Sequence, residues 1–111
     1  MTETLTIKGL AWKISVQSEK EYDKCHGNDS HGITHNEDRH IYIRYNAVNI
    51  ETILHELGHA YYTSCLTYTA DLNIHDVEEI FCEILSVHTA EILKTARQLL
   101  NYMKNTISED E

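Results

Sequence analysis

Residues 49–61 read NIETILHELGHAY, and the spacing of their apolar side chains predicts an α-helix. The apolar positions recur three and four residues apart: Ile50, Ile53, Leu54, Leu57, Ala60 and Tyr61. Asn49 is a favourable N-cap, and Glu51 adds a negative charge in the first turn, where the helix dipole favours it. Gly58 is unfavourable inside a helix, so we expect another element to approach the backbone closely there. We expect the helix to end at about residue 68.

The same helix carries the pattern H-E-x-x-H at His55, Glu56 and His59. Side chains four residues apart share a helix face, so the two histidines can offer two nitrogens to one ion. Two imidazoles suit Zn²⁺, which in catalytic sites takes a third protein ligand and keeps one position open for water. Glu56 is then the candidate general base that takes a proton from that water. A surface helix that carries these three residues by chance is the simpler alternative.

The third ligand is sought downstream of the motif. The metzincin extension is excluded, because Tyr62 and Cys65 stand where that class needs Gly and His. Three acidic residues lie near the start of the last predicted helix: Glu78, Glu79 and Glu83. A Glu from a second helix packed against the first would give the His₂Glu set found in gluzincins. Other candidate ligands nearby are His75 and His88.

Two observations keep the choice among these acidic residues open. Asp76-x-x-Glu79 is similar to a capping box, in which case Glu79 only helps to begin a helix. By helical phase, Glu78 lies nearer than Glu79 to the apolar stripe of that helix.

Residues 32–86 resemble the small phage and mobile-element H-E-x-x-H proteins, relatives of the ImmA/IrrE-type and minimal gluzincin metallopeptidases. The resemblance rests on the strand RHIYI at residues 39–43, the segment TILHELGHA at residues 52–60, and a downstream Glu in a characteristic register. In that register, small residues follow Glu79 at Cys82 and Ser86, and a large one at Leu85. The resemblance implies Glu79 as the third metal ligand and Glu83 as a carboxylate that orients a ligating His.

The family likeness also implies an activity and a partner. It implies a zinc-dependent metallopeptidase of minimal zincin-like fold, with Zn²⁺ as cofactor and a protein or peptide substrate, for instance a regulatory protein such as a repressor. In relatives an extended peptide adds to a sheet edge, which places the substrate beside residues 41–45 if that strand lies at an edge. Candidates for stabilising the oxyanion are Tyr45, Tyr61, Tyr62 and His88.

Two other functions fit the sequence. The first is a zinc-containing but non-catalytic binding or inhibitor protein with a structural His₂Glu site. Structural sites prefer four protein ligands and often Cys, and the spacing of Cys25, Cys65 and Cys82 places none of them to supply one. The second is a metal-free α+β interaction protein.

The rest of the chain predicts a single α+β domain over residues 1–111. We expect a strand over residues 5–16 with a bulge or bend at Gly9, a loop or helical turn over 17–29, and a hairpin of residues 33–35 and 39–45. This gives a small antiparallel sheet of about three strands, followed by the H-E-x-x-H helix and a long helix over about 76–105. The tail from about residue 106 is expected to be disordered.

Composition narrows the partners. A formal net charge of −9 argues against a nucleic-acid partner, because phosphate binding needs clustered Lys and Arg. We find no apolar run that could span a membrane and no secretory signal at the N-terminus. An odd number of widely spaced cysteines suggests reduced thiols and a cytoplasmic location. Four further histidines are expected to be solvated loop residues rather than a second metal site: His26, His31, His35 and His40.

Overall fold

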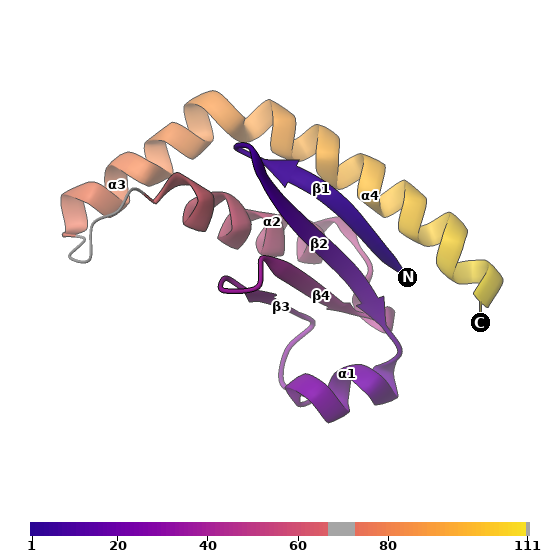
Figure 1. Cartoon of the computed structure of the whole chain (residues 1–111). Helices are drawn as coiled ribbons and strands as arrows, with labels where there is room; N and C mark the ends of the chain where they lie inside the picture. The colour runs from indigo at the N-terminus through magenta and orange to yellow at the C-terminus, as the bar shows by residue number, and fades with distance from the viewer. Residues whose placement is uncertain (67–72, 111) are drawn as a thin grey trace.

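The chain folds into a four-stranded sheet with helices, and its α+β class is as predicted (Figure 1). The computed structural model describes residues 1–66 and 73–110, with the side chains of 107–110 left out. The elements are β1 (Thr2–Ile7), β2 (Leu10–Gln17), α1 (Glu19–His26), β3 (Gly32–His35), β4 (His40–Arg44), a 3₁₀ turn (Tyr45–Ala47), α2 (Ile50–Cys65), α3 (Ile74–Glu83), a π-helical turn (Ile84–His88) and α4 (Thr89–Asp110).

The sheet has the order β1-β2-β4-β3 and is mixed, so the expected antiparallel sheet of about three strands is wrong in both respects. The first expected strand is in fact a hairpin, in which Ile7 pairs with Leu10 across a two-residue turn. Lys8 and Gly9 have φ values of 50° and 80°. Positive φ at both central residues is what a type I′ turn requires, and such turns match the twist of a hairpin. The predicted bend at Gly9 is therefore a full reversal of the chain.

β2 and β4 are parallel. Parallel neighbours need a long connection, and here α1 and β3 lie between the two strands in the sequence and provide it. The predicted hairpin is confirmed: β3 pairs antiparallel with β4, with His35 opposite His40. β4 lies inside the sheet and β3 at its edge. The edge available beside the motif helix is therefore β3, and the condition for a substrate beside residues 41–45, that their strand lies at an edge, is not met.

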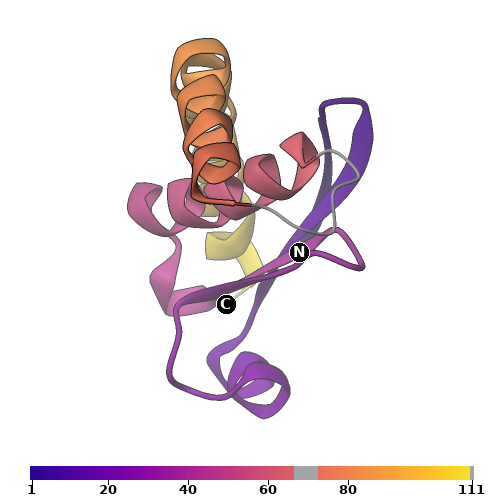
Figure 2. The ribbon, with the colours of Figure 1, turned by 90° about the vertical axis from the view of Figure 1, so that its left-hand side faces the viewer.

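α2 and α4 pack on one face of the sheet and close the main core (Figure 2). The fully buried members include Trp12, Ile14, Ile41, Ile43, Ile53, Leu57, Tyr61, Ala96 and Met103. Tyr42 alternates with Ile41 and Ile43 and so points to the opposite face, where its ring contacts His26 of α1. α2 is thus held with one side against the sheet and another against α4.

The expected last helix is divided and begins two residues earlier than predicted. Asn73 is the N-cap of α3, and its side chain and that of Asp76 form a reciprocal capping box. Asp76 is therefore the acid of the box rather than its cap, and Glu79 has no part in it. None of the helices in the described part of the chain combines the length and apolarity needed to cross a membrane.

α2 is the predicted motif helix, with Asn49 as its N-cap. It ends at Cys65 rather than at residue 68, because Leu66 is extended, with a ψ of 124°. Residues 67–72, which include the end of the expected helix and the connection to the next, lie outside the described residues. The expected disorder beyond about residue 106 falls largely on side chains that are not described.

Candidate metal centre and its cavity

His55 and His59 lie one turn apart on the exposed face of α2, with their Nε2 atoms 3.3 Å apart. Two nitrogens bound to one tetrahedral zinc with bonds of about 2.0–2.1 Å are separated by about 3.3–3.4 Å. The rings meet nearly edge to face, at 75°. The pair therefore fits a shared zinc ion as it stands, although a hydrogen bond between two imidazoles has the same length.

Glu56 points away from this face toward the sheet edge and is buried, with 4% of its surface exposed. The hydroxyl of Thr34 on β3 donates a 2.7 Å hydrogen bond to Glu56 Oε1. A Cβ added at Gly32 would lie 3.0 Å from Glu56 Cγ and 3.1 Å from Oε2. β3 thus holds the carboxylate, and any larger residue at position 32 would require the Glu56 side chain to shift.

The close approach expected at Gly58 does not exist. A Cβ built there meets no atom within 4 Å apart from the backbone of its own helix. The glycine that another element does approach closely is Gly32, where an added Cβ would meet the Glu56 side chain.

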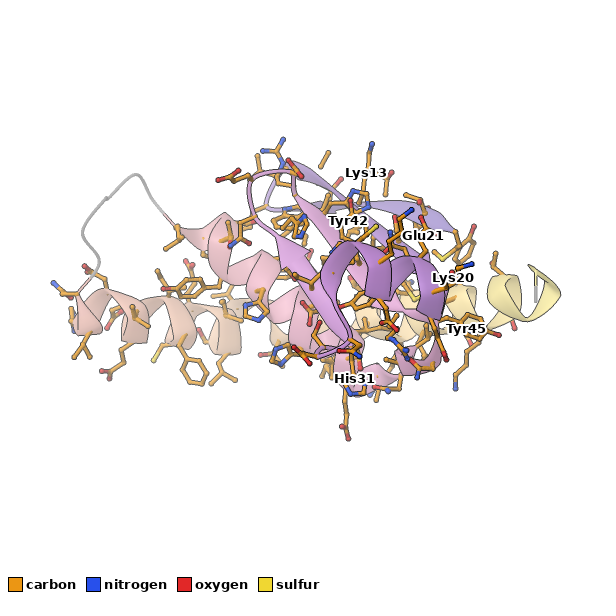
Figure 3. The ribbon with its side chains drawn as sticks, turned by 90° about the horizontal axis from the view of Figure 1, so that it is seen from below. Lys13, Lys20, Glu21, His31, Tyr42 and Tyr45 are labelled. Carbon is orange, nitrogen blue, oxygen red and sulfur yellow. The ribbon has the colours of Figure 1, made fainter. Side chains whose placement is uncertain are left out.

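A cavity of about 310 Å³ opens beside these residues, between the first half of α2 and the start of β3. Its lining consists of Ser30, His31, Gly32, Glu51, Thr52, His55 and Glu56. The volume is at the small end of the range for ligand pockets. His31, labelled in Figure 3, is exposed and contributes to the same wall as Glu56. One proposed ligand and the proposed base therefore share one cavity.

The predicted third ligand is not gathered with the histidines. Glu78 and Glu79 are both exposed on α3. Within residues 1–66 and 73–106, the one group of three or more His, Cys, Asp or Glu side chains with donor atoms close enough for an ion is Cys65, Glu83 and His88. His55 and His59 therefore lie together and Glu56 shares a cavity with His55, whereas Glu79 forms no ligand group with the histidines in the described residues.

The predicted oxyanion donors also lie elsewhere. None of Tyr45, Tyr61, Tyr62 and His88 lines the cavity. Tyr61 is buried; burial, with the charge of the Glu91 carboxylate adding to it, raises the pKa of its hydroxyl to about 12. The sequence does not point to His31 and Gly32 as cavity residues, nor to Thr34 as the partner of Glu56, because these roles depend on β3 lying beside α2.

Three of the four additional histidines, His26, His35 and His40, pack in a cluster of aromatic rings on the outer face of the sheet. They are not residues of solvated loops. His26 of α1 contacts His35 of β3, with ring centroids 5.5 Å apart, and His40 stacks on Tyr42 at 4.1 Å. Burial lowers the pKa of both His26 and His40. The expectation that these are solvated loop residues is therefore wrong for His26, His35 and His40.

We compared the chain with protein-family models, with curated proteins and with solved structures, and nothing in any of the three matches it.

Proposed function

We propose that the protein is a zinc-dependent peptide hydrolase, with His55 and His59 as metal ligands. The observation that carries the proposal is the 3.3 Å separation of their Nε2 atoms, with the buried Glu56 carboxylate lining the same cavity as His55. A zinc ion held there supplies Lewis acidity and lowers the pKa of a bound water. The third ligand stays a prediction: Glu79, with Glu78 and His75 as alternatives. Glu83 and His88, which the sequence also offers, lie with Cys65 instead.

Glu56 is the proposed general base. Its carboxylate follows His55 in sequence and lines the same cavity, so it can accept a proton from water there and pass it to the leaving amine. The Thr34 hydroxyl occupies Oε1 and fixes the rotamer, which leaves Oε2 for proton transfer. Fixing the base before substrate arrives lowers the entropic cost of the reaction.

β3 is the proposed substrate-binding strand. It is an edge strand, and its first residue lines the cavity, so an extended peptide added along it would pass the proposed base. His31 directly precedes β3 and contributes an exposed imidazole to the cavity wall. We assign it as the side chain best placed to stabilise an oxyanion, in place of the four candidates drawn from the sequence.

Glu56→Gln tests the proposal. We expect the variant to keep about one zinc equivalent at the histidine pair and to lose about 10²–10⁴-fold in cleavage, because the amide cannot accept the proton. Cleavage is measured with fluorescein-labelled casein and a mixed peptide library, and zinc by elemental analysis. Glu51→Gln is the matched control, since Glu51 lines the same cavity but is exposed.

Two results would contradict the hydrolase. If Glu56→Gln binds zinc and shows the same cleavage rate as the wild type, the non-catalytic zinc protein is favoured. If the variant with both His55→Ala and His59→Ala binds as much zinc as the wild type, the histidine pair is excluded as a metal site. Comparison of Glu79→Gln with Glu78→Gln then identifies the third ligand, since only a ligand should change zinc affinity.

A further inference from the structure

Three potential metal ligands from two separate parts of the chain meet at the far end of α2. The ligand atoms of Cys65, Glu83 and His88 all lie within 4.8 Å of one another. Cys65 is the last residue of α2, Glu83 the last of α3, and His88 the last of the π-helical turn. Their spacing in sequence did not suggest this cluster, because it forms only when α3 folds back onto α2.

The π-helical turn is what brings Glu83 and His88 together. In an α-helix of 3.6 residues per turn, residues five apart point about 140° away from each other. A π-turn widens the helix so that residues five apart come close to alignment, and such turns are frequent at functional sites. The turn at Ile84–His88 lies between the two ligands, so it carries His88 to the same side as Glu83.

We infer that Cys65, Glu83 and His88 form a second site for a divalent cation of the zinc class, separate from the histidine pair. Thiolate, imidazole and carboxylate are the three zinc ligands of proteins, and three of them leave one position for water. Glu91 Oε2 lies 3.6 Å from His88 Nδ1. A carboxylate beside one nitrogen is the usual partner of an imidazole that binds a metal through the other.

The interactions already present at the cluster do not prevent an ion from binding. Lys8 Nζ lies 3.8 Å from Glu83 Oε2. This ion pair is partly exposed, and such pairs contribute little to stability. Tetrahedral zinc needs donor atoms about 3.3–3.7 Å apart, so from separations of at most 4.8 Å the donor atoms need to approach one another by no more than roughly 1.5 Å. Glu83, nearly half exposed, is free to make that movement.

The consequence of such a site is mechanical. An ion there would join the end of α2 to the bend between α3 and α4. α3 buries none of its own residues, so this bend is where it is attached to the rest of the fold. The site therefore stabilises the junction of the helices and requires no contact with substrate.

Cobalt binding tests the inference. The metal-free full-length protein is titrated with Co²⁺, and we expect a thiolate-to-cobalt charge-transfer band that persists in the variant His55→Ala with His59→Ala. Cys65→Ser should abolish the band and leave cobalt binding at the histidine pair intact. Glu83→Gln and His88→Gln should weaken the band-forming site at least about tenfold, because even groups that only orient a ligand contribute about 10–100-fold.

Cys25→Ser and Cys82→Ser are the matched controls, since both thiols are exposed and outside the cluster. Each should keep the band. Zinc should also raise the melting temperature of the variant that lacks both histidines, and should not raise it once Cys65→Ser is added. A wild-type titration without the band, or a band that survives Cys65→Ser, would overturn the second site whether or not the protein cleaves peptides.

Discussion

At the scale of single residues, the candidate site depends on how Glu56 is held. A buried carboxylate is costly unless it is hydrogen-bonded, and here the Thr34 hydroxyl provides the bond. The backbone of Gly32 lies so close to the same side chain that an added Cβ would stand 3.0 Å from Glu56 Cγ. The carboxylate therefore has one position, and the two residues that determine it come from the edge strand.

Gly32→Ala tests that constraint. The new methyl group would stand 3.0 Å from Glu56 Cγ, so the carboxylate must move. We expect cleavage to fall severalfold, since the required shift is smaller than the displacement of about 1 Å that can cost a catalytic group about 100-fold. Gly58→Ala is the control: its Cβ meets nothing within 4 Å, and it should keep activity and gain up to about 1 kcal/mol of stability. Equal activity of the two variants would show that Glu56 is not fixed by β3.

At the scale of elements, the sequence predicts segments whose signals are local and misses those that depend on tertiary contacts. Asn49 and the apolar stripe after it predict α2 and its cap correctly. The reversal at Lys8 and Gly9 is missed, because alternation continues through it and only the positive φ values reveal the turn. The π-turn before His88 has no sequence signature of its own. The π-turn is the feature that brings His88 to the same side as Glu83 and so completes the cluster with Cys65.

The two asparagine caps allow a prediction about how α2 and α3 are stabilised. Asn49 Oδ1 accepts from Thr52 N at 2.9 Å, and Asn73 Oδ1 accepts from Asp76 N at the same distance. Either Asn→Ala change should cost about 1 kcal/mol. α2 is part of the core, so Asn49→Ala should lower the global free energy of unfolding in denaturant. α3 has no buried residue, so Asn73→Ala should instead speed hydrogen exchange of its own amides about fivefold.

If Asn73→Ala lowers the global free energy of unfolding as much as Asn49→Ala does, the proposed difference between α2 and α3 is wrong. It would mean that α3 unfolds only together with the core.

At the scale of the whole molecule, the sheet separates two chemical environments. One face carries the apolar core under α2 and α4, and the other carries the histidine and tyrosine rings beside α1. The cavity forms where the edge strand meets α2, so its lining depends on the strand order β1-β2-β4-β3. No local sequence pattern predicts this strand order. The sequence therefore predicts the H-E-x-x-H motif but not which residues line the cavity beside it.

The outer face makes stability depend on pH. Burial lowers the pKa of His26, and the nearby His35 adds to the effect. Burial also lowers the pKa of His40, with Lys13 and His35 lowering it further and Asp38 opposing. The unfolded chain, with histidine pKa values of about 6.5, therefore binds more protons than the folded chain below that pH.

The free energy of unfolding should consequently be fully retained above about pH 7 and should fall as the pH drops below about 6.5. The measurement is urea denaturation at several pH values between 7 and 5, with a chelator present so that no metal contributes. Asp23, whose pKa is lowered from 3.8 mainly by its hydrogen bonds from Arg44, affects only more acidic solutions. The variant His26→Gln with His40→Gln should flatten the decline, whereas His75→Gln, on the exposed surface of α3, should leave it unchanged. If the decline is equally steep in all three proteins, protonation of the outer face is not its cause.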